Sequence, residues 1–340
     1  MTRPIKAFIL AAGLGTRLKP LTFYLPKPLF PFCFPTLLDL AFWRIYDTDI
    51  SEIALNSHYL PEKIRSHIKD CGLISNVNIS YEKELLGTGG ALGPLSDFFK
   101  GADVLIYNSD IISDADLNKL INAHQEADAD ATLLLLPNLL PNKNPVYCDG
   151  DKIVGIGQMP ANDNQGKVTM HTFTGIHIVS EKFRKFAPQT GYWHITDVYK
   201  EALQKGLILK SCQHDGFWHD MGTPYEYLRA VTDFVKNYNK NLDQRLGISF
   251  LTKKLKSDVS LVTESTNNPS IKGNNMIPRN LKIPKTSQIG PNVIITKILP
   301  IPEGVSISNS LLIDEVMLKN NAAYTDSILF RDEIVIVNEE

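Results

Sequence analysis

The stretch AAGLGTRLKPLTFYLPKPLFP at residues 11–31 places two glycines and two basic side chains directly after a short apolar run. Such a run is typical of a central parallel strand that is buried on both faces. Gly13 and Gly15 have no Cβ, so the chain can turn tightly and bring its N–H groups against a bulky anion. Arg17 and Lys27 add positive charge, and the prolines stiffen the segment. The stretch therefore predicts a phosphate-binding loop.

Two familiar glycine loops do not fit this stretch. The dinucleotide fingerprint GxGxxG requires a glycine where this chain has Leu18, and no GxxxxGK string followed by Ser or Thr occurs in the chain. Residues 13–28 instead fill every fixed position of GxGTRLxPLTxxxPKP. They resemble the signature of the nucleotidyltransferases that join a sugar 1-phosphate to a nucleoside triphosphate. A match at so many fixed positions is far more specific than a pair of glycines.

The resemblance implies a reaction in which a phosphate oxygen of the sugar 1-phosphate attacks the α-phosphate and pyrophosphate leaves. Because two anions must meet, fixed cations and positioning matter more than proton transfer. By the resemblance, Arg17 holds the β- and γ-phosphates and Lys27 lies at the α-phosphate, as the catalytic pair. The loop residues that it implies in nucleotide binding are Ala11, Ala12, Gly13, Gly15 and Thr16.

Two aspartates resemble the family's ligands for Mg²⁺, the cofactor that the resemblance implies. Asp110 follows the strand expected at residues 104–107, in YNSD, and Asp220 lies in FWHDMGTP. Carboxylate oxygens suit a hard cation that is shared with phosphates. Asp110 has an alternative interpretation as a helix cap, for which Ser113 and Asp114 are rivals. The resemblance implies that Asp110 and Asp220 bind one ion together.

Two further segments match nucleotide-binding positions of the family. EKELLGTGGA, residues 82–91, is similar to the segment that lines the base and ribose, and its candidate contacts are Glu82, Gly87 and Thr88. Without the resemblance, the same segment indicates a loop that enters a helix capped by Thr88. Asn56, in NSHYL, matches a position near the nucleotide or sugar, although Asn at a strand end is also a common turn former.

The acceptor side departs from the family pattern. Thr174 and Gly175, in FTGIHIV, resemble the strand that borders the sugar. Many relatives have Glu-Lys-Pro after the strand expected at 152–156, and that lysine grips the sugar phosphate, but this chain has Gln-Met-Pro at residues 158–160. Either another cation such as Lys167 replaces the lysine, or the acceptor is bound differently.

Apolar strands and amphipathic helices alternate along the N-terminal part of the chain. Their spacing suits parallel crossovers and predicts a Rossmann-like, doubly wound mixed α/β sheet, with ligands beyond the carboxyl ends of its strands. The expected strands are residues 5–10, 52–56, 77–81, 104–107 and 131–136, and the expected helices are residues 37–46, 61–69, 90–99 and 116–127. A β-rich stretch at 146–179 follows, then helices at 195–206 and 224–237.

The C-terminal part of the chain follows a different rule. Isoleucine recurs every six residues from Ile283 to Ile313, and a second aliphatic series from Val293 to Met317 has the same period. Lys319 breaks the register, which resumes, shifted, from Ala322 to Ile334. Period six is typical of a hexapeptide β-solenoid rather than of a helix or a simple strand. The pattern predicts a short β-helix, left-handed as in many of the resembling enzymes, with irregular β structure as the alternative.

Length and composition fit two domains and a small-molecule reaction. The predicted division is a catalytic domain at residues 1–238, a linker at 239–275 and the β-helix at 276–340. The net charge of −2 argues against nucleic-acid binding. No export signal or membrane-length apolar stretch is visible, so we expect a cytoplasmic protein with reduced thiols and no membrane partner. The cysteines, which lack metal-binding spacing, are Cys33, Cys71, Cys148 and Cys212.

The predicted function is a Mg²⁺-dependent transfer of a nucleoside monophosphate from a nucleoside triphosphate to a sugar 1-phosphate, giving an NDP-sugar. The overall pattern favours a mannose-1-phosphate guanylyltransferase-like enzyme. Alternatives are a uridylyltransferase acting on an amino sugar 1-phosphate, a phosphocholine cytidylyltransferase, and a non-catalytic paralogue that senses NDP-sugar. The solenoid counts against the cytidylyltransferase, and the intact basic pair and aspartates count against the paralogue. The C-terminal domain is a candidate surface for homo-oligomer formation.

Overall fold

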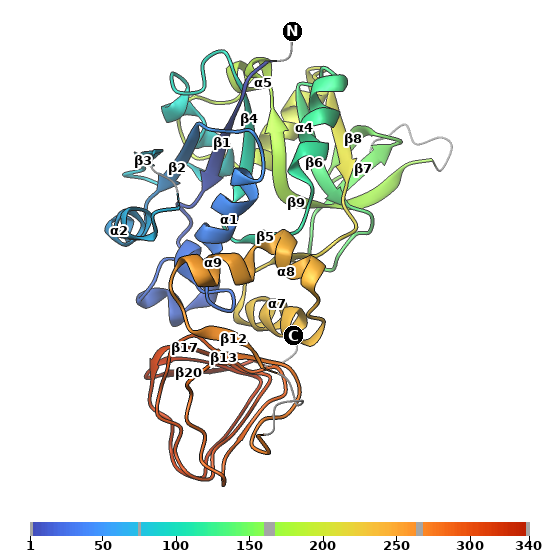
Figure 1. The fold of residues 1–340 in the computed structure, drawn as a ribbon. Coiled ribbons are helices and arrows are strands. Elements are labelled where there is room, and N and C mark those ends of the chain that lie inside the picture. The colour runs from blue at the N-terminus through green and yellow to red at the C-terminus, as the bar shows by residue number, and fades with distance from the viewer. Residues whose placement is uncertain (1–2, 74–75, 160–166, 263–267, 338–340) are drawn as a thin grey trace. The chain divides into compact units, whose positions relative to one another are not determined.

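The computed structural model describes residues 3–73, 76–159, 167–262 and 268–337, and the chain forms two compact units. The first unit comprises residues up to 14 together with 41–218, and the second comprises 15–40 together with 219–340. The boundary between the units therefore falls after Leu14, within the predicted phosphate-binding loop, residues 11–31. We call these residues the basic loop, and its first part, which contains Gly13 and Gly15, the glycine loop. Figure 1 shows the course of the chain. No helix among the described residues is both long and apolar enough to cross a bilayer.

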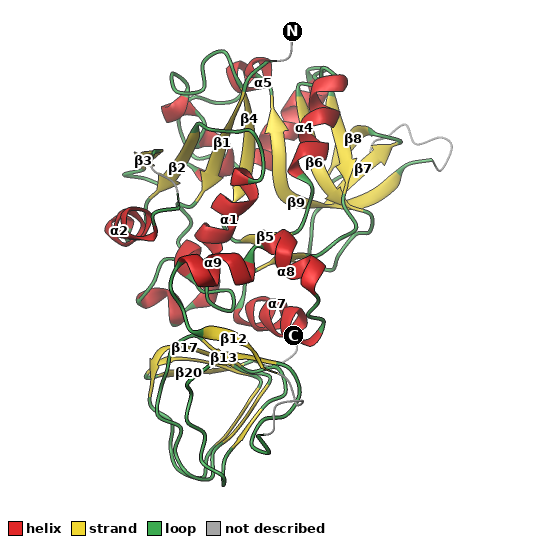
Figure 2. Cartoon of the chain, in the orientation of Figure 1, coloured by secondary structure: helices red, strands yellow, loops and turns green. Residues whose placement is uncertain are grey.

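A nine-stranded mixed sheet forms the centre of the first unit (Figure 2). In sheet order its strands are β3 (Val77–Tyr81), β2 (Ile53–Ser57), β1 (Ile5–Leu10), β4 (Asp103–Asn108), β9 (Thr169–Val179), β6 (Ala131–Leu136), β10 (Leu209–Gln213), β8 (Lys152–Ile156) and β7 (Pro145–Asp149). β3, β2, β1 and β4 are parallel neighbours, whereas β9 runs antiparallel between β4 and β6. All the expected strands are present, but alternation along the chain did not predict the insertion of β9.

The interior of this sheet is apolar on both faces. Ala7, Phe8 and Ile9 of β1 are all 0% exposed, as expected for a central strand. Phe8 packs against Phe99, with ring centroids 5.6 Å apart. The helices that accompany the sheet are α2 (Pro61–Cys71), α4 (Leu117–Glu126), α5 (Glu181–Phe186) and α6 (Ile195–Gln204); α1 (Leu37–Tyr46) contains the unit boundary.

The helix expected at residues 90–99 does not form as one element. A single turn, α3, covers Gly87–Gly90, and a 3₁₀ turn, η4, covers Gly93–Leu95. Glycine is a poor helix former, and Pro94 has no N–H to donate. The apolar pattern is nevertheless buried, since Leu92, Leu95 and Phe99 belong to the core of the first unit. The pattern therefore predicted burial correctly and regular helix wrongly.

Helix α7 (Pro224–Lys236) organises the N-terminal part of the second unit. Thr223 caps it, because its hydroxyl accepts a hydrogen bond from the Glu226 N–H at 3.2 Å. Tyr227 stacks on Phe30 at 5.7 Å between ring centroids, and its hydroxyl donates to the carbonyl of Pro31. Segment 15–40, which carries most of the basic loop, is thus packed on α7.

The predicted linker at 239–275 contains regular structure. It includes α8 (Lys240–Leu246), α9 (Ile248–Lys254) and β12 (Val259–Val262), and residues 263–267 of it lie outside the described residues. Polar residues are frequent both in its two short helices and between its elements, which is why composition alone indicated a linker. Its buried side chains include Leu242, Leu246, Ile248 and Leu251.

Short strands stack in parallel at the C-terminal end of the second unit (Figure 1). One stack is β13 (Asn275–Pro278), β15 (Ile294–Ile295), β17 (Leu311–Val316) and β19 (Ser327–Arg331). Another is β14 (Gln288–Ile289), β16 (Ser306–Ser308) and β18 (Ala323–Thr325). β20 (Glu333–Ile336) pairs antiparallel with β19 and ends the first stack, and β12 pairs antiparallel with β13. We call residues 275–336 the stacked-strand region.

The six-residue period corresponds to the interior of this region as far as Ile307; beyond it Leu312, the cross-strand partner of Ile295, lies in the interior cluster, and Ile313 is buried outside that cluster. Met317, the last member of the second series, is instead 85% exposed, and its predicted burial is wrong. The register shifts between Ile313 and Val316, where Asp314 has a φ of 60°, so that Val316 is buried in place of Met317. Ile334 is 50% exposed, because the parallel stack ends at β19. The isoleucines of the first series that are 0–7% exposed are Ile289, Ile295, Ile301, Ile307 and Ile313.

We predict that Ile301→Asp opens the stacked-strand region locally. Ile301 is 7% exposed within an aliphatic cluster, so the new carboxylate would be buried without a partner. Such a charge destabilises by about 3–5 kcal/mol. The melting profile or the size-exclusion profile should change. Ile298→Asp is the matched control, because Ile298 is 58% exposed and should tolerate the charge. Unchanged melting and elution for Ile301→Asp would contradict its burial.

Candidate active site

The carboxyl end of β1 is tied by buried polar groups to β2 and, through it, to the residue that follows β3. The Ala11 N–H donates to Asn56 Oδ1 at 2.7 Å, and Asn56 Nδ2 donates to Glu82 Oε1 at 2.7 Å. The other Glu82 oxygen accepts from the Leu86 N–H at 3.1 Å. Asn56 and Glu82 are 3% and 4% exposed. Both side chains therefore brace the start of the glycine loop, whereas their predicted contacts with a nucleotide remain predictions.

The glycines of LLGTGG lie against the protein's own backbone. A Cβ on Gly87, which has a φ of 70°, would lie 2.5 Å from the Trp193 carbonyl oxygen, and one on Gly90 would lie 2.3 Å from that of Gly191. The Thr88 hydroxyl accepts from the Ile195 N–H at 2.9 Å, at the start of α6. Close packing on residues 189–195 thus explains the glycines at 87 and 90, whatever else this segment contacts.

Asp110 lies in the turn between β4 and β5 (Ile111–Ser113). The adjacent Ser109 donates to the Leu10 carbonyl through both its N–H, at 3.1 Å, and its hydroxyl, at 2.6 Å. This turn is therefore held at the carboxyl end of β1, beside the start of the glycine loop. The cap of the following helix α4 is Asp116, whose carboxylate accepts from the Lys119 N–H at 3.1 Å, so Asp110 is not that cap.

Thr174 and Gly175 form an irregularity in β9. Gly175 has a φ of 84°, and a Cβ there would lie 2.7 Å from Asn108 Nδ2. The Thr174 hydroxyl donates to the Leu134 carbonyl at 2.8 Å, and the side chain is 1% exposed. Asn108, just before Asp110, thus occupies the space over Gly175. Sequence reasoning overlooked Asn108, although its position in the strand-end motif YNSD was an available signal.

Within the second unit, Gly15, Thr22 and Lys27 pack together. Gly15 has a φ of 60°, and its carbonyl accepts from the Thr22 hydroxyl at 3.1 Å. A Cβ on Gly15 would lie 2.8 Å from Thr22 Cγ2 and 3.4 Å from Lys27 Cβ. Lys27 is 9% exposed, so its aliphatic stem is part of the loop's own packing. Glycine is therefore required at position 15, because a side chain there would collide with Thr22.

Arg17 lies over the segment that contains Asp220. A Cβ on Gly222 would lie 2.8 Å from Arg17 Nη2 and 2.6 Å from Glu226 Oε2. The guanidinium and the Glu226 carboxylate therefore meet at the DMGTP backbone, and a side chain at 222 would displace both of them. Asp220 ends β11 (Trp218–Asp220), two residues before Gly222. Two motifs that are about 200 residues apart in the sequence are thereby brought together.

His219, beside Asp220, is a neutral group near neutral pH. Its Nε2 lies 3.9 Å from Asp233 Oδ2. Burial lowers the pKa of His219 to about 4, although the nearby Asp233 carboxylate acts in the opposite direction.

The acceptor segment contains a cation that sequence reasoning missed. Gln158 and Lys167 are exposed on either side of the undescribed residues 160–166, which include Pro160. A Cβ on Gly157 would lie 3.5 Å from Lys200 Cε and 3.8 Å from Lys200 Nζ. Lys200, on α6, thus lies beside Gly157, two residues before Met159, which occupies the place of the lysine in Glu-Lys-Pro. No spacing in the sequence connects these two segments.

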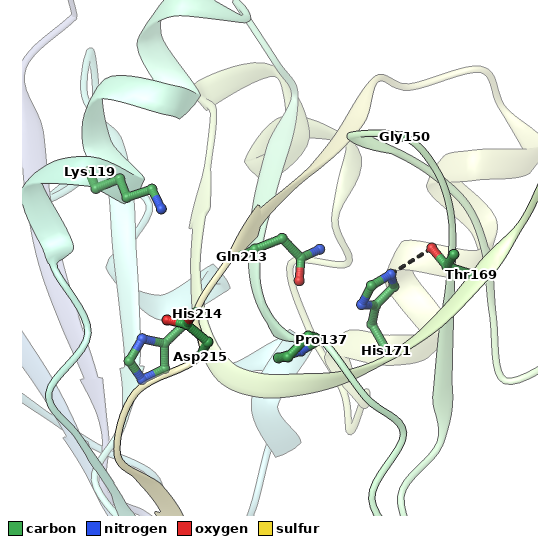
Figure 3. Close-up of a pocket in the computed structure, with 8 residues that line it drawn as sticks. All are labelled: Lys119, Pro137, Gly150, Thr169, His171, Gln213, His214 and Asp215. Carbon is green, nitrogen blue, oxygen red and sulfur yellow. Dashed lines mark hydrogen bonds between the residues drawn. The ribbon is translucent and has the colours of Figure 1, made fainter.

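A cavity of about 400 Å³ opens in the first unit near the carboxyl ends of β6 and β10 (Figure 3). His171 in its wall is engaged within the protein, with its Nε2 2.7 Å from the Thr169 hydroxyl. None of the predicted site residues lines this cavity, so it is a separate feature. Its lining residues are Lys119, Pro137, Gly150, Thr169, His171, Gln213, His214 and Asp215.

Comparison with known proteins connects this geometry to a family. The profile of the family described as "Nucleotidyl transferase" matches residues 6–237. The chain belongs to this nucleotidyl transferase family. The match contains the glycine loop, both candidate metal aspartates and the acceptor segment, and it ends at the last turn of α7.

Curated relatives in this family are distant. A mannose-1-phosphate guanylyltransferase of Mycobacterium tuberculosis is 26% identical over 246 residues, which cover 69% of this chain and 66% of that protein. A UTP–glucose-1-phosphate uridylyltransferase of Synechocystis is 26% identical, over 70% of this chain and 65% of that protein. The chain thus spans about two thirds or less of these relatives.

Solved structures share the fold. A Bacillus anthracis protein assigned as a glucose-1-phosphate thymidylyltransferase, in complex with sucrose, has a TM-score of 0.60 at 23% identity and covers 70% of this chain and 99% of its own. HddC from Yersinia pseudotuberculosis, complexed with GMP-PN, has a TM-score of 0.54 at 23% identity and covers 69% and 100%. These similarities support a mixed α/β nucleotidyl transferase fold that precedes the stacked-strand region.

Proposed function

We propose that this chain is a sugar-1-phosphate nucleotidyltransferase that requires Mg²⁺, and that mannose 1-phosphate and GTP are its preferred substrates. The observation that carries the proposal is the position of Arg17 over Gly222, which joins the complete glycine loop to the DMGTP segment in a chain of this family. Mannose-1-phosphate guanylyltransferases are frequent among its curated relatives, which supports the preference.

In the proposed reaction, a phosphate oxygen of the sugar 1-phosphate forms a bond to the α-phosphorus, and the bond from that phosphorus to the bridging oxygen breaks. Pyrophosphate leaves, and no proton transfer is needed for balance. Lys27 neutralises the charge on the α-phosphate, and Arg17 holds the departing phosphates. Fixed cations in such positions stabilise developing charge without reorganisation. Thr174, Gly175 and the neighbouring Asn108 border the acceptor, and Lys200 is a candidate for the missing phosphate-binding lysine.

Asp110 and Asp220 have the chemistry that a Mg²⁺ site needs. Both are carboxylates with intermediate exposure, and hard oxygen ligands suit this ion when it is shared with substrate phosphates. When bound, the ion would neutralise phosphate charge. We also propose that the stacked-strand region is a short left-handed β-helix, that it is the surface through which copies associate, and that the protein acts in the cytoplasm.

The experiment is a matrix of pyrophosphate-release assays. Each of GTP, UTP, dTTP, CTP and ATP is paired with mannose, glucose and N-acetylglucosamine 1-phosphates and with phosphocholine, in Mg²⁺. We expect the highest kcat/KM for GTP with mannose 1-phosphate. Preference for UTP with the amino sugar would replace the proposed substrates by the uridylyltransferase alternative. Thermal stabilisation by an NDP-sugar without turnover of any pair would instead identify a sensing paralogue.

A further inference from the structure

Tyr24 lies in the middle of the basic loop and is held by the C-terminal hairpin of the same unit. Its ring meets Phe330 edge-on, with centroids 5.6 Å apart and an interplanar angle of 79°. The guanidinium carbon of Arg331 lies 5.0 Å from the Tyr24 ring centroid. The Tyr24 hydroxyl is 3.4 Å from Glu333 Oε1, to which it donates. Three residues of the β19–β20 hairpin, Phe330, Arg331 and Glu333, therefore contact one loop residue.

Arg331, which contacts Tyr24, has an unusual backbone conformation. It occupies the tight turn between Phe330 and Glu333, which are cross-strand partners, and its φ is 58°. Residues other than glycine seldom adopt positive φ, and such positions persist where the surrounding structure requires them. The guanidinium also lies 3.7 Å from Asp314 Oδ2, so it is held between Asp314 and Tyr24.

The loop has little regular structure of its own. Its described elements after Gly15 are 3₁₀ turns of three residues each, which contain few internal hydrogen bonds. Thr22 holds the loop through a hydrogen bond within it, from its hydroxyl to the Gly15 carbonyl, and Tyr24 holds it through its contact with Phe330 of the hairpin. In the sequence, Arg17 precedes these two residues and Lys27 follows them. A segment of this kind depends on external contacts to keep one conformation.

We propose that Tyr24 and Arg331 are positioning residues, through which the C-terminal hairpin holds the basic loop in the conformation that aligns Arg17 and Lys27. This inference rests on the proposed nucleotidyltransferase function for its catalytic consequence. It assigns the last strands of the chain a role in catalysis in addition to their structural role.

The decisive variant is Arg331→Gly. Glycine favours the positive φ of this turn, so the hairpin should persist while the guanidinium is removed. Tyr24→Ala removes the partner ring, and Tyr24→Phe keeps the ring and loses only the long hydroxyl contact. Lys297→Ala is the matched control, because Lys297 is an exposed cation that pairs with the same Asp314 and has no described contact with Tyr24.

Each variant is measured by kcat and KM on the best substrate pair and by amide hydrogen exchange of residues 15–31. Arg331→Gly and Tyr24→Ala should lower kcat about tenfold with little change in KM for the nucleotide. Misplacement of a catalytic group by about an ångström lowers rates by on the order of 10²-fold, so a tenfold loss corresponds to a smaller misplacement of Arg17 and Lys27. Exchange in the loop should rise at an unchanged melting temperature for Arg331→Gly. The double variant should be no worse than either single variant, since both remove one interaction.

Tyr24→Phe and Lys297→Ala should behave like the wild type in both measurements. Unchanged loop exchange in Arg331→Gly would overturn the proposal, and so would raised exchange with a kcat within twofold of the wild type. If the wild type turned over no substrate pair, the proposed function would fail, while raised loop exchange would still support the contact as the element that holds the loop.

Discussion

Replacing Lys27 by alanine is expected to lower turnover by ~10² to 10³-fold, the loss typical of removing one group that stabilises transition-state charge. Lys27 is 9% exposed and its Cβ lies beside Gly15, so its aliphatic stem belongs to the packing of the basic loop. Arg17→Ala should have an effect of similar size, since Arg17 would hold the leaving pyrophosphate. Pyrophosphate release by purified variants measures both.

Two further variants separate charge from packing in this experiment. Lys27→Met keeps most of the buried stem and should be as inactive as Lys27→Ala, while melting like the wild type. Lys19→Ala removes a neighbouring exposed cation, whose Nζ lies 5.6 Å from the Phe23 ring centroid, and should remain active. Turnover near the wild-type rate in Lys27→Ala or in Arg17→Ala would remove that residue from the catalytic pair.

Asp110→Asn and Asp220→Asn are expected to shift the Mg²⁺ dependence of turnover to much higher concentrations. Each change removes a negative charge from a hard-cation site but leaves the side-chain shape nearly unchanged. A magnesium titration of activity measures the shift. The matched control is Asp116→Asn, because Asp116 is the observed cap of α4 and asparagine caps a helix about as well as aspartate. Titrations of both site variants that superimpose on the wild type would reject the metal assignment.

The sequence predicted the strands and the loop well, because these depend on local signals. Apolar runs followed by glycine, and a signature with many fixed positions, are readable within a few residues. The insertion of β9 between β4 and β6 depends on pairing between strands that are distant in the chain, and period and composition do not encode it. The contact of Asn108 with Gly175 of β9 depends on the same pairing, although the position of Asn108 in YNSD was itself readable.

The stacked-strand region shows where a periodic signal ends. Six-residue spacing predicted burial from Ile289 to Ile313 and failed at Met317. The repeat is already one residue short at Leu312, which pairs with Ile295, and the register shifts again between Ile313 and Val316. The spacing shows a break only at Lys319, after the residues at which the register shifts. The contact of Arg331 with Tyr24 was likewise unreadable, since about 300 residues separate the two and neither belongs to a shared motif.

The packing of LLGTGG on residues 189–193 changes how tolerance to mutation should be interpreted in this segment. Side chains introduced at Gly87, Gly90 or Gly93 would lie within 2.1–2.5 Å of carbonyl oxygens of the protein itself, before any ligand is considered. Consider a saturation-mutagenesis screen that selects for the abundance of folded protein. Such a screen would score all three positions as essential even in cells that do not need the enzyme's product. If these glycines are invariant among related chains, that invariance reflects a requirement of folding. Evidence for nucleotide contact would have to come from neighbouring residues whose side chains can be changed without such a collision.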